Sequence, residues 1–258
     1  MRDVIRLVWF DLKQELKPPV WIMVEWFTFA VQLFIYGAIL SQLVDATQLN
    51  VNYQQFYAVG FVVMMTFEVG SHTGRHFVEH AHEGVLPYLL SLPISRAKLF
   101  LAITLQGGAE LTLLIGVPLA ITLFLIGNLT VISVTAAIAT LFCLGFGVAG
   151  LMLGLSFVAF KSSDLYTAMV TGLSTIIIRF STVLYPLVFL QQRGFDSVAK
   201  LSPLTYGSDL VRWVLGFDPS LIIYDPAYAV AVLVALAIST LGLGVLLLQR
   251  LVEGVKSG

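Results

Sequence analysis

The chain has 258 residues, of which 58% are hydrophobic and 11% are charged, with a formal net charge of −1 at pH 7. Soluble domains contain roughly 45–50% apolar residues, so this composition indicates an integral membrane protein. The small net charge excludes the concentrated positive surface that nucleic-acid binding needs. Cys143 is the single cysteine and has no partner for a disulfide within the chain.

The first element expected from the sequence is an amphipathic helix that ends before Pro18. Its apolar residues recur at helical spacing opposite basic ones: Ile5, Val8, Trp9, Leu12 and Leu16 against Arg2, Arg6, Lys13 and Lys17. Such a helix lies in the membrane interface. Pro18 and Pro19 then turn the chain into the membrane.

Six apolar runs are long enough to cross about 30 Å of hydrocarbon at 1.5 Å per residue. They lie near residues 20–44, 55–75, 99–127, 131–160, 165–189 and 226–249. We expect each to be a helix, because a helix satisfies its own backbone polar groups and the alternating pattern of a barrel strand is missing. The expected fold is an all-α integral membrane protein, with residues 1–258 forming a single transmembrane domain.

The distribution of lysine and arginine predicts the orientation. With the N-terminus inside, the cytoplasmic side receives Arg2, Arg6, Lys13, Lys17, Arg75, Arg96, Lys98, Lys161, Arg250 and Lys256. The outer side receives only Arg193, Lys200 and Arg212. We therefore expect a multi-pass protein of the plasma membrane with both termini in the cytoplasm.

Two segments do not fit a simple array of six helices. On the cytoplasmic side, residues 79–97 contain a leucine-rich stretch of about ten residues, about 15 Å as a helix and too short to cross. Ser95 follows it as the expected N-cap of the third span. On the outer side, residues 185–225 are broken by prolines and glycines, which predicts short re-entrant helices covered by protein.

The same two segments carry a family pattern. The cytoplasmic one is Glu83-Gly84-Val-Leu-Pro-Tyr-Leu-Leu-Ser-Leu-Pro93-Ile-Ser95-Arg96, and the outer ones are Tyr185-Pro186, Leu201-Ser-Pro203-Leu-Thr-Tyr206 and Asp209-Leu-Val-Arg212. They resemble the segments E-x-G-T-x-E-x-L-L-x-x-P-x-S, F-P and N-P-L-T-Y…D-x-x-R of the membrane subunits of ABC-2 type transporters. Val85, Pro87 and Ser202 depart from the family's usual threonine, glutamate and asparagine.

The resemblance implies the permease subunit of an ATP-driven exporter of a drug, lipid or lipid-linked glycan. The implied partners are two copies of an ABC ATPase, which bind ATP and Mg²⁺, and a second copy of the chain or a homologous permease. The resemblance assigns ATPase coupling to Glu83, Gly84, Leu86, Leu89, Leu90 and Pro93, and the outer re-entrant region to Tyr185, Pro186, Pro203, Tyr206 and Arg212. The chain has no G-x-x-x-x-G-K-[ST] loop, so we expect neither a cofactor nor catalysis of its own.

Three charged residues, Glu68, Glu110 and Arg179, fall inside expected spans. A charge at the bilayer centre costs at least about 2.5–3.5 kcal/mol, so these residues either pair or line a substrate path. Counting helical rise from the expected cytoplasmic boundaries places Arg179 and Glu110 at similar depths. The sequence therefore predicts that Arg179 pairs with Glu110, with Glu68 closer to the cytoplasm.

Two other motifs match patterns found in zinc enzymes and in dinucleotide-binding proteins. His76, Glu79 and His80 spell H-x-x-E-H, the inverted zincin pattern. The alternative function is therefore a stand-alone zinc-dependent enzyme or an ion-coupled secondary transporter. We expect no metal, because a zincin also needs a third protein ligand and a water-filled site, whereas His72, His76 and His80 lie one turn apart at the expected cytoplasmic end of the second span, where a polar helix face is ordinary. Gly145, Gly147 and Gly150 match G-x-G-x-x-G inside a long apolar helix with no strand before it, which favours close helix packing.

The aromatic residues of the first span have two possible roles. They are Trp21, Trp26, Phe27, Phe29, Phe34 and Tyr36. Such side chains ordinarily form an interfacial belt or pack against lipid. The alternative is that they line a pathway for a hydrophobic substrate.

Overall fold

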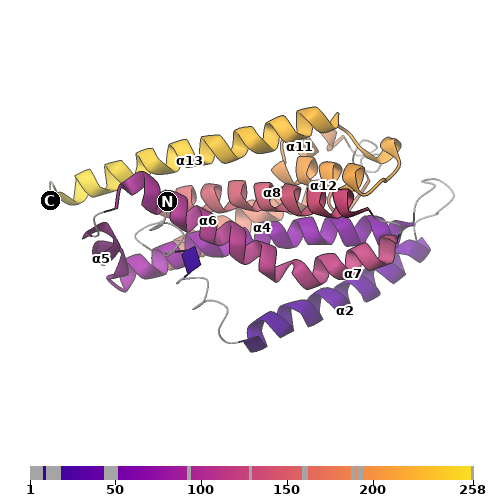
Figure 1. The fold of residues 1–258 in the computed structure, drawn as a ribbon, viewed down its shortest axis with the longest axis horizontal. Helices are drawn as coiled ribbons and strands as arrows, with labels where there is room; N and C mark the ends of the chain where they lie inside the picture. Colours follow the sequence, from indigo (N-terminus) through magenta and orange to yellow (C-terminus); the bar gives the residue numbers. More distant parts are fainter. Residues whose placement is uncertain are drawn as a thin grey trace.

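The computed structural model describes residues 8–9, 19–43, 52–91, 94–127, 130–158, 162–186, 190 and 194–256, and the regular elements in these ranges are helical. The principal helices are α2 (Pro19–Leu43), α4 (Tyr53–His82), α6 (Arg96–Leu114), α7 (Gly116–Ile126), α8 (Val131–Val158), α9 (Ser163–Arg179) and α13 (Pro226–Lys256). The short ones are α5 (Val85–Ser91), α11 (Asp196–Ala199), α12 (Pro203–Val214) and the 3₁₀ turn η1 (Pro219–Leu221). The long helices run along a common direction in an elongated bundle (Figure 1).

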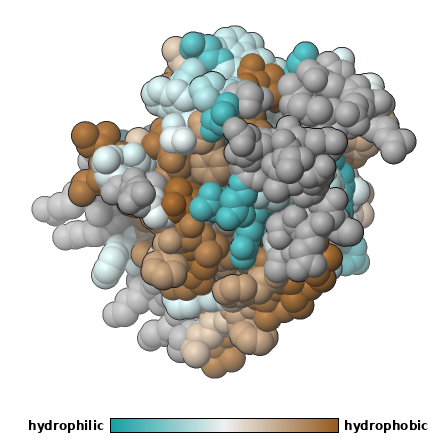
Figure 2. Space-filling view, turned by 90° about the vertical axis from the view of Figure 1, so that its right-hand side faces the viewer, coloured by the Kyte–Doolittle hydropathy of each residue, from teal (hydrophilic) through white to brown (hydrophobic). Residues whose placement is uncertain are grey.

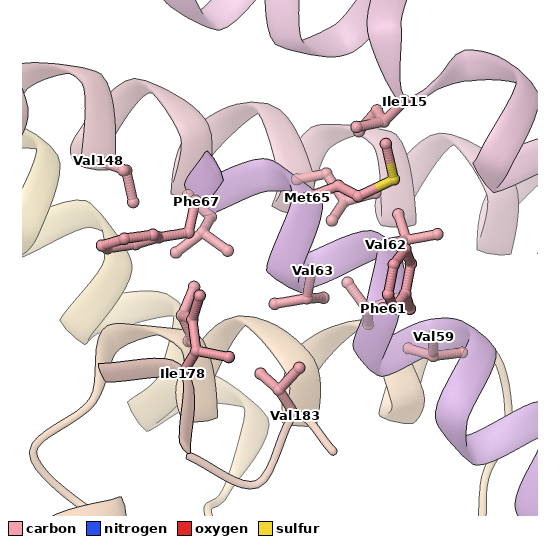
Figure 3. Packing of buried hydrophobic residues seen from close by; sticks show 14 of the residues in the cluster. Val59, Phe61, Val62, Val63, Met65, Phe67, Ile115, Val148, Ile178 and Val183 are labelled. Atoms are coloured by element: carbon pink, nitrogen blue, oxygen red, sulfur yellow. The ribbon is translucent and has the colours of Figure 1, made fainter. Parts of the chain in front are cut away.

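The centre of the bundle is formed by α4 and α8. Helix α8 packs against α4, α6, α12 and α13. Val148 of α8, Ile115, and Ile178 and Val183 near the end of α9 surround the buried side chains of α4 (Figure 3). The bundle core therefore extends over several helices rather than lying between one pair.

Small residues allow this close packing. A Cβ atom added at Gly145, Gly147 or Gly150 would lie 2.7–3.0 Å from side-chain atoms of Leu111, Leu236 and Thr240, respectively. Contacts that close force neighbouring atoms to move. The G-x-G-x-x-G pattern therefore serves helix packing, as the sequence predicted.

The two irregular segments lie at opposite ends of the bundle. Helix α5 lies at the end where α13 finishes, and α11 and α12 lie at the other end (Figure 1). Seen from the α12 end, hydrophilic residues gather in patches between hydrophobic ones (Figure 2). A mixed surface of this kind suits a membrane–water boundary.

Local sequence explains how α4 begins and how α5 follows it. The side chain of Asn52 accepts a hydrogen bond from the backbone N–H of Gln54 (3.0 Å), which caps the start of α4. After α4, Gly84 has a φ of 79°, a conformation that glycine adopts without steric cost. The chain can therefore reverse direction there and start α5 at once.

Three helices in the described residues are long and apolar enough to cross a membrane: Arg96–Leu114, Val131–Val158 and Pro226–Leu247. Ile22–Gly37 and Gly116–Ile126 are apolar but shorter. The expected spans 20–44 and 55–75 coincide with α2 and α4, although α4 carries many polar residues. The full six-span arrangement stays a prediction.

The third span, expected near 99–127, is built from two successive helices. The helix breaks at Ile115, between α6 and α7. Pro118 has no N–H to offer the carbonyl of Leu114 four residues earlier. That carbonyl instead accepts a hydrogen bond from the indole Nε1–H of Trp26 on α2 (2.7 Å). The break is therefore stabilised by a contact that no local pattern reveals.

The fifth span, expected at 165–189, is also shorter than predicted, because α9 ends at Arg179. Pro186 could not donate to the carbonyl of Thr182 in a continued helix. The carbonyls of Thr182, Val183 and Leu184 accept instead from the side chains of Arg212 and Tyr53. Residues 187–189 lie outside the described part.

The expected N-terminal interfacial helix falls almost wholly outside the described residues. Val8 and Trp9 are described, and both are helical. Pro18 is outside the described residues, whereas Pro19 begins α2. The interfacial helix therefore stays a prediction.

Candidate functional site

A cavity of about 610 Å³ lies between α2, α4 and α9. Sites for drug-sized molecules are typically about 300–1,000 Å³. Its walls combine charged, polar and aromatic side chains, among them Glu25, Gln32, Tyr57, Glu68, Ser174 and Arg179. The cavity therefore has the size and the chemistry of a site for an amphipathic molecule.

Helix α2 turns one polar face toward this cavity. Glu25, Thr28, Gln32 and Tyr36 all line it and follow one another at intervals of three or four residues. This spacing places side chains on one side of a helix. Other exposed side chains of α2 are large and apolar: Val20, Met23, Val24, Phe27, Val31, Phe34, Ile35 and Ile39. A membrane helix with this distribution presents polar groups inward and hydrocarbon outward.

A second cavity, of about 260 Å³, continues from the first. Both are lined by Glu25, Met65, Glu68 and Ser174. The second extends along α4 to Arg75 and also reaches His72. Together the two cavities form one depression from Tyr57 to Arg75, which we call the α2–α4–α9 groove.

Charges are distributed unevenly along the groove. Glu25 and Glu68 line the part of the groove that the two cavities share. Ser174 of α9 also lines both cavities, and Arg179 lies five residues, about 7.5 Å, further along α9 in the larger one. The acidic pair therefore lies in the middle of the groove, with Arg179 displaced toward the end of α9.

The structure separates the charged residues predicted from the sequence. Glu68 and Arg179 both line the groove. Glu110 lies on α6, only 5% exposed, and is not among the lining residues of the groove. The pairing of Arg179 with Glu110 stays a prediction. Glu25 was not predicted as a site residue, although it is the single charged residue of α2 and could have been recognised from the sequence for that reason.

Arg212 forms the most buried polar centre of the outer region, with 0% exposure. Its Nη1 donates to the carbonyl of Thr182 (2.9 Å), and its Nη2 donates to those of Val183 (3.0 Å) and Phe56 (3.3 Å). The guanidinium carbon also lies 3.5 Å from the centre of the Phe56 ring. Arg212 thus fastens α12 and the segment after α9 onto α4.

The other predicted outer residues surround this centre. Tyr185 lines the groove and Pro186 is buried. Pro203 is the first residue of α12, a position that tolerates its missing N–H. The Tyr206 hydroxyl donates to the carbonyl of Lys200 (2.8 Å), and its ring stacks on that of Tyr224 at 4.6 Å. This part of the family pattern is therefore mainly structural, and Tyr185 is its contact with the groove.

A short helix, α5, occupies part of the segment 79–97 that the sequence assigns to ATPase coupling. Glu83 and Gly84 are exposed just before it, and Leu89 is partly buried within it. Ser95 is the N-cap residue of α6, as predicted. Pro93 and the side chains of Leu86 and Leu90 lie outside the described part.

The H-x-x-E-H motif lies near the C-terminal end of α4. His76 Nδ1 lies 3.5 Å from Glu79 Oε2, and the rings of His76 and His80 are 6.4 Å apart. Among the described residues, no three His, Cys, Asp or Glu side chains are grouped so as to hold a metal ion.

The family comparison identifies the class. The family model described as ABC-2 type transporter matches residues 2–216. Because the match covers most of the chain, the protein belongs to the ABC-2 type transporter family. It is therefore a transporter permease component and an integral membrane protein. A comparison with curated protein sequences finds no match.

Proposed function

We propose that the chain is the permease subunit of an ATP-driven exporter and that its substrate moves along the α2–α4–α9 groove. The observation that carries the proposal is the cavity of about 610 Å³ with polar and aromatic walls, in a chain of the ABC-2 family. Its mixed lining suits a hydrophobic or amphipathic substrate, such as a drug, lipid or lipid-linked glycan, that leaves the cytoplasm.

Energy comes from a separate ABC ATPase subunit, present in two copies, that binds ATP and Mg²⁺. Helix α5 is its docking element, because it is short and lies at the end of the bundle opposite α12 (Figure 1). Tyr88 on this helix is 64% exposed and so is available for contact. The exposed Glu83 and the turn at Gly84 set the approach of α5 to the ATPase.

A second permease subunit, identical or homologous, completes the transporter. The groove lies between α2, α4 and α9, and α2 exposes large apolar side chains that are available to a second subunit. The bias of lysine and arginine supports a plasma-membrane protein with both termini in the cytoplasm.

The docking proposal is tested by the double substitution Leu89→Asp and Leu90→Asp. Uncompensated charge in a docking groove opposes binding, so the ATPase should no longer copurify, while membrane insertion persists. The matched control is Val131→Asp with Ile132→Asp, an apolar pair 80% and 79% exposed at the start of α8. Unchanged copurification of the ATPase with the first double variant refutes the docking assignment.

The groove is tested by cysteine labelling in a Cys143→Ala background. A maleimide attached at Ser174→Cys, inside the groove, should obstruct transport, and its labelling rate should change when ATP is added. The control is Ser239→Cys on the exposed side of α13. Transport that survives complete labelling at Ser174→Cys contradicts the proposed path.

Ion-coupled transport is the second candidate, because carboxylates in a membrane groove can bind protons or cations. It predicts that the purified chain alone transports substrate when an ion gradient is imposed. Transport by the chain without an ATPase rejects the ATP-driven proposal.

A further inference from the structure

The middle of the groove concentrates negative charge. Glu25 on α2 and Glu68 on α4 line both cavities, so two carboxylates face the same part of the groove. Ionisable side chains within membrane helices are costly and ordinarily mark substrate or ion pathways. A positive group placed between these two carboxylates would relieve their repulsion.

The larger cavity, which both glutamates line, has aromatic side chains along its wall. Phe29, Tyr36, Tyr57, Phe61 and Tyr185 all line the larger cavity. The faces of aromatic rings attract organic cations, and they also pack against apolar substituents. The wall therefore suits a cation that carries large hydrophobic groups.

The size of the site argues against an inorganic ion. A volume of about 610 Å³ greatly exceeds the space of a bare ion or a water molecule, whose share of liquid volume is about 30 Å³. Metal sites also need several close ligands, and the described residues contain no group of three acidic, His or Cys side chains arranged for one. A bulky organic cation matches both the charge and the volume.

Arg179 makes one end of the larger cavity positively charged. It lines the larger cavity and lies five residues, about 7.5 Å, along α9 from Ser174, which lines both cavities with the acidic pair. A cation held at the acidic pair is therefore repelled from that end of the cavity. Removing the charge of Arg179 and removing that of Glu68 should change cation affinity in opposite directions.

We propose that the α2–α4–α9 groove selects hydrophobic organic cations, with the positive centre between Glu25 and Glu68 and the apolar substituents against the aromatic wall. This proposal rests on the proposed function, in which the groove is the substrate path. It adds the chemical class of the substrate and the residues that recognise it.

The test uses two probes of the same shape and opposite charge, tetraphenylphosphonium and tetraphenylborate. Binding of radiolabelled tetraphenylphosphonium is measured on the full chain in lipid nanodiscs, with empty nanodiscs as the background. We expect saturable binding of the cation that tetraphenylborate does not displace. Glu25→Gln and Glu68→Gln should each weaken cation binding by about tenfold, which corresponds to about 1.4 kcal/mol.

Two variants control for misfolding. Arg179→Gln should strengthen cation binding, an outcome that a loss of structure does not produce. Asp164→Asn, which changes an exposed carboxylate at the start of α9, should leave binding unchanged. Equal affinity for both probes, or wild-type cation affinity in the Glu25→Gln, Glu68→Gln double variant, overturns the proposal.

Protection of Ser174→Cys separates failure of the two proposals. If either probe slows maleimide labelling at this position while the glutamate variants bind the cation normally, the groove remains the path and cation selection is wrong. If neither probe binds or protects, and the adduct leaves transport intact, both the cation selectivity and the path through the groove are rejected.

Discussion

Arg212 and the acidic pair of the groove handle charge in opposite ways. The guanidinium of Arg212 is fully buried, bonds to three backbone carbonyls and lies against an aromatic ring. Glu25 and Glu68 instead both line a cavity of substrate size. The first arrangement uses charge to join segments of backbone. The second leaves charge available to a ligand.

This comparison distinguishes buried charges that stabilise the fold from charges that bind a ligand. A buried ion whose hydrogen bonds end on backbone of the same chain stabilises the fold. Charges that line a cavity of substrate size raise the energy of the empty protein and are satisfied by what enters. Stability and transport should therefore respond oppositely to mutation in the two regions.

The largest expected effect is at Arg212. Arg212→Met removes the donors to Thr182, Val183 and Phe56, and we expect a loss of about 3–5 kcal/mol in the free energy of unfolding. Arg212→Lys should restore only part of it, because one ammonium cannot reproduce the planar guanidinium fork. Thermal unfolding in detergent, followed by size-exclusion chromatography, measures the change. Wild-type melting of Arg212→Met would show that the anchor is not structural.

A smaller effect is expected where the anchored segment meets α4. A Cβ added at Gly60 would collide with the carbonyl oxygen of Val183, a backbone atom that cannot rotate away. Gly60→Ala should therefore cost about 1–3 kcal/mol of stability. Gly154→Ala is the matched control, since nothing lies within 4 Å of its added Cβ, and it should be neutral or stabilising. Equal melting temperatures for the two variants would contradict the close approach.

The next effect concerns the break between α6 and α7. Trp26→Phe keeps an aromatic ring but removes the N–H that binds the carbonyl of Leu114. We expect a loss of about 1 kcal/mol, the usual net value of one hydrogen bond. The same melting assay measures it, and no loss would mean that solvent satisfies this carbonyl equally well.

The extent of several helices was predictable because apolar length is a strong local signal. The expected runs 20–44 and 131–160 agree with Pro19–Leu43 and Val131–Val158 to within about two residues. The differences occur at Ile115, three residues before Pro118, and after Arg179, seven residues before Pro186, where hydrophobicity continues although the regular helix is interrupted or ends. The partners of the interrupted backbone, Trp26 and Arg212, come from distant parts of the sequence and could not be inferred from local patterns.

Part of the candidate site could also be predicted, because a charge inside an apolar run is a strong local signal. Glu68 and Arg179 were detected as charges inside apolar runs. Glu25 was not, because it lies only five residues inside the expected span 20–44, where a charge costs less than at the bilayer centre. Sequence spacing gives the depth of a residue but not its neighbouring helix. The groove that joins Glu68 and Arg179 to Glu25 therefore required the tertiary structure.

The smallest expected change in stability is also the sharpest test of the comparison. Replacing Glu25 and Glu68 by glutamine keeps the shape of each side chain and removes their mutual repulsion. The double variant should therefore melt at the wild-type temperature or slightly above it, while ATP-driven transport of tetraphenylphosphonium falls by about tenfold. Arg212→Met should show the reverse pattern, with low stability, and Asp164→Asn should change neither property. A double variant that melts as low as Arg212→Met would show that the glutamates hold the fold together, and the contrast between the two regions would then be wrong.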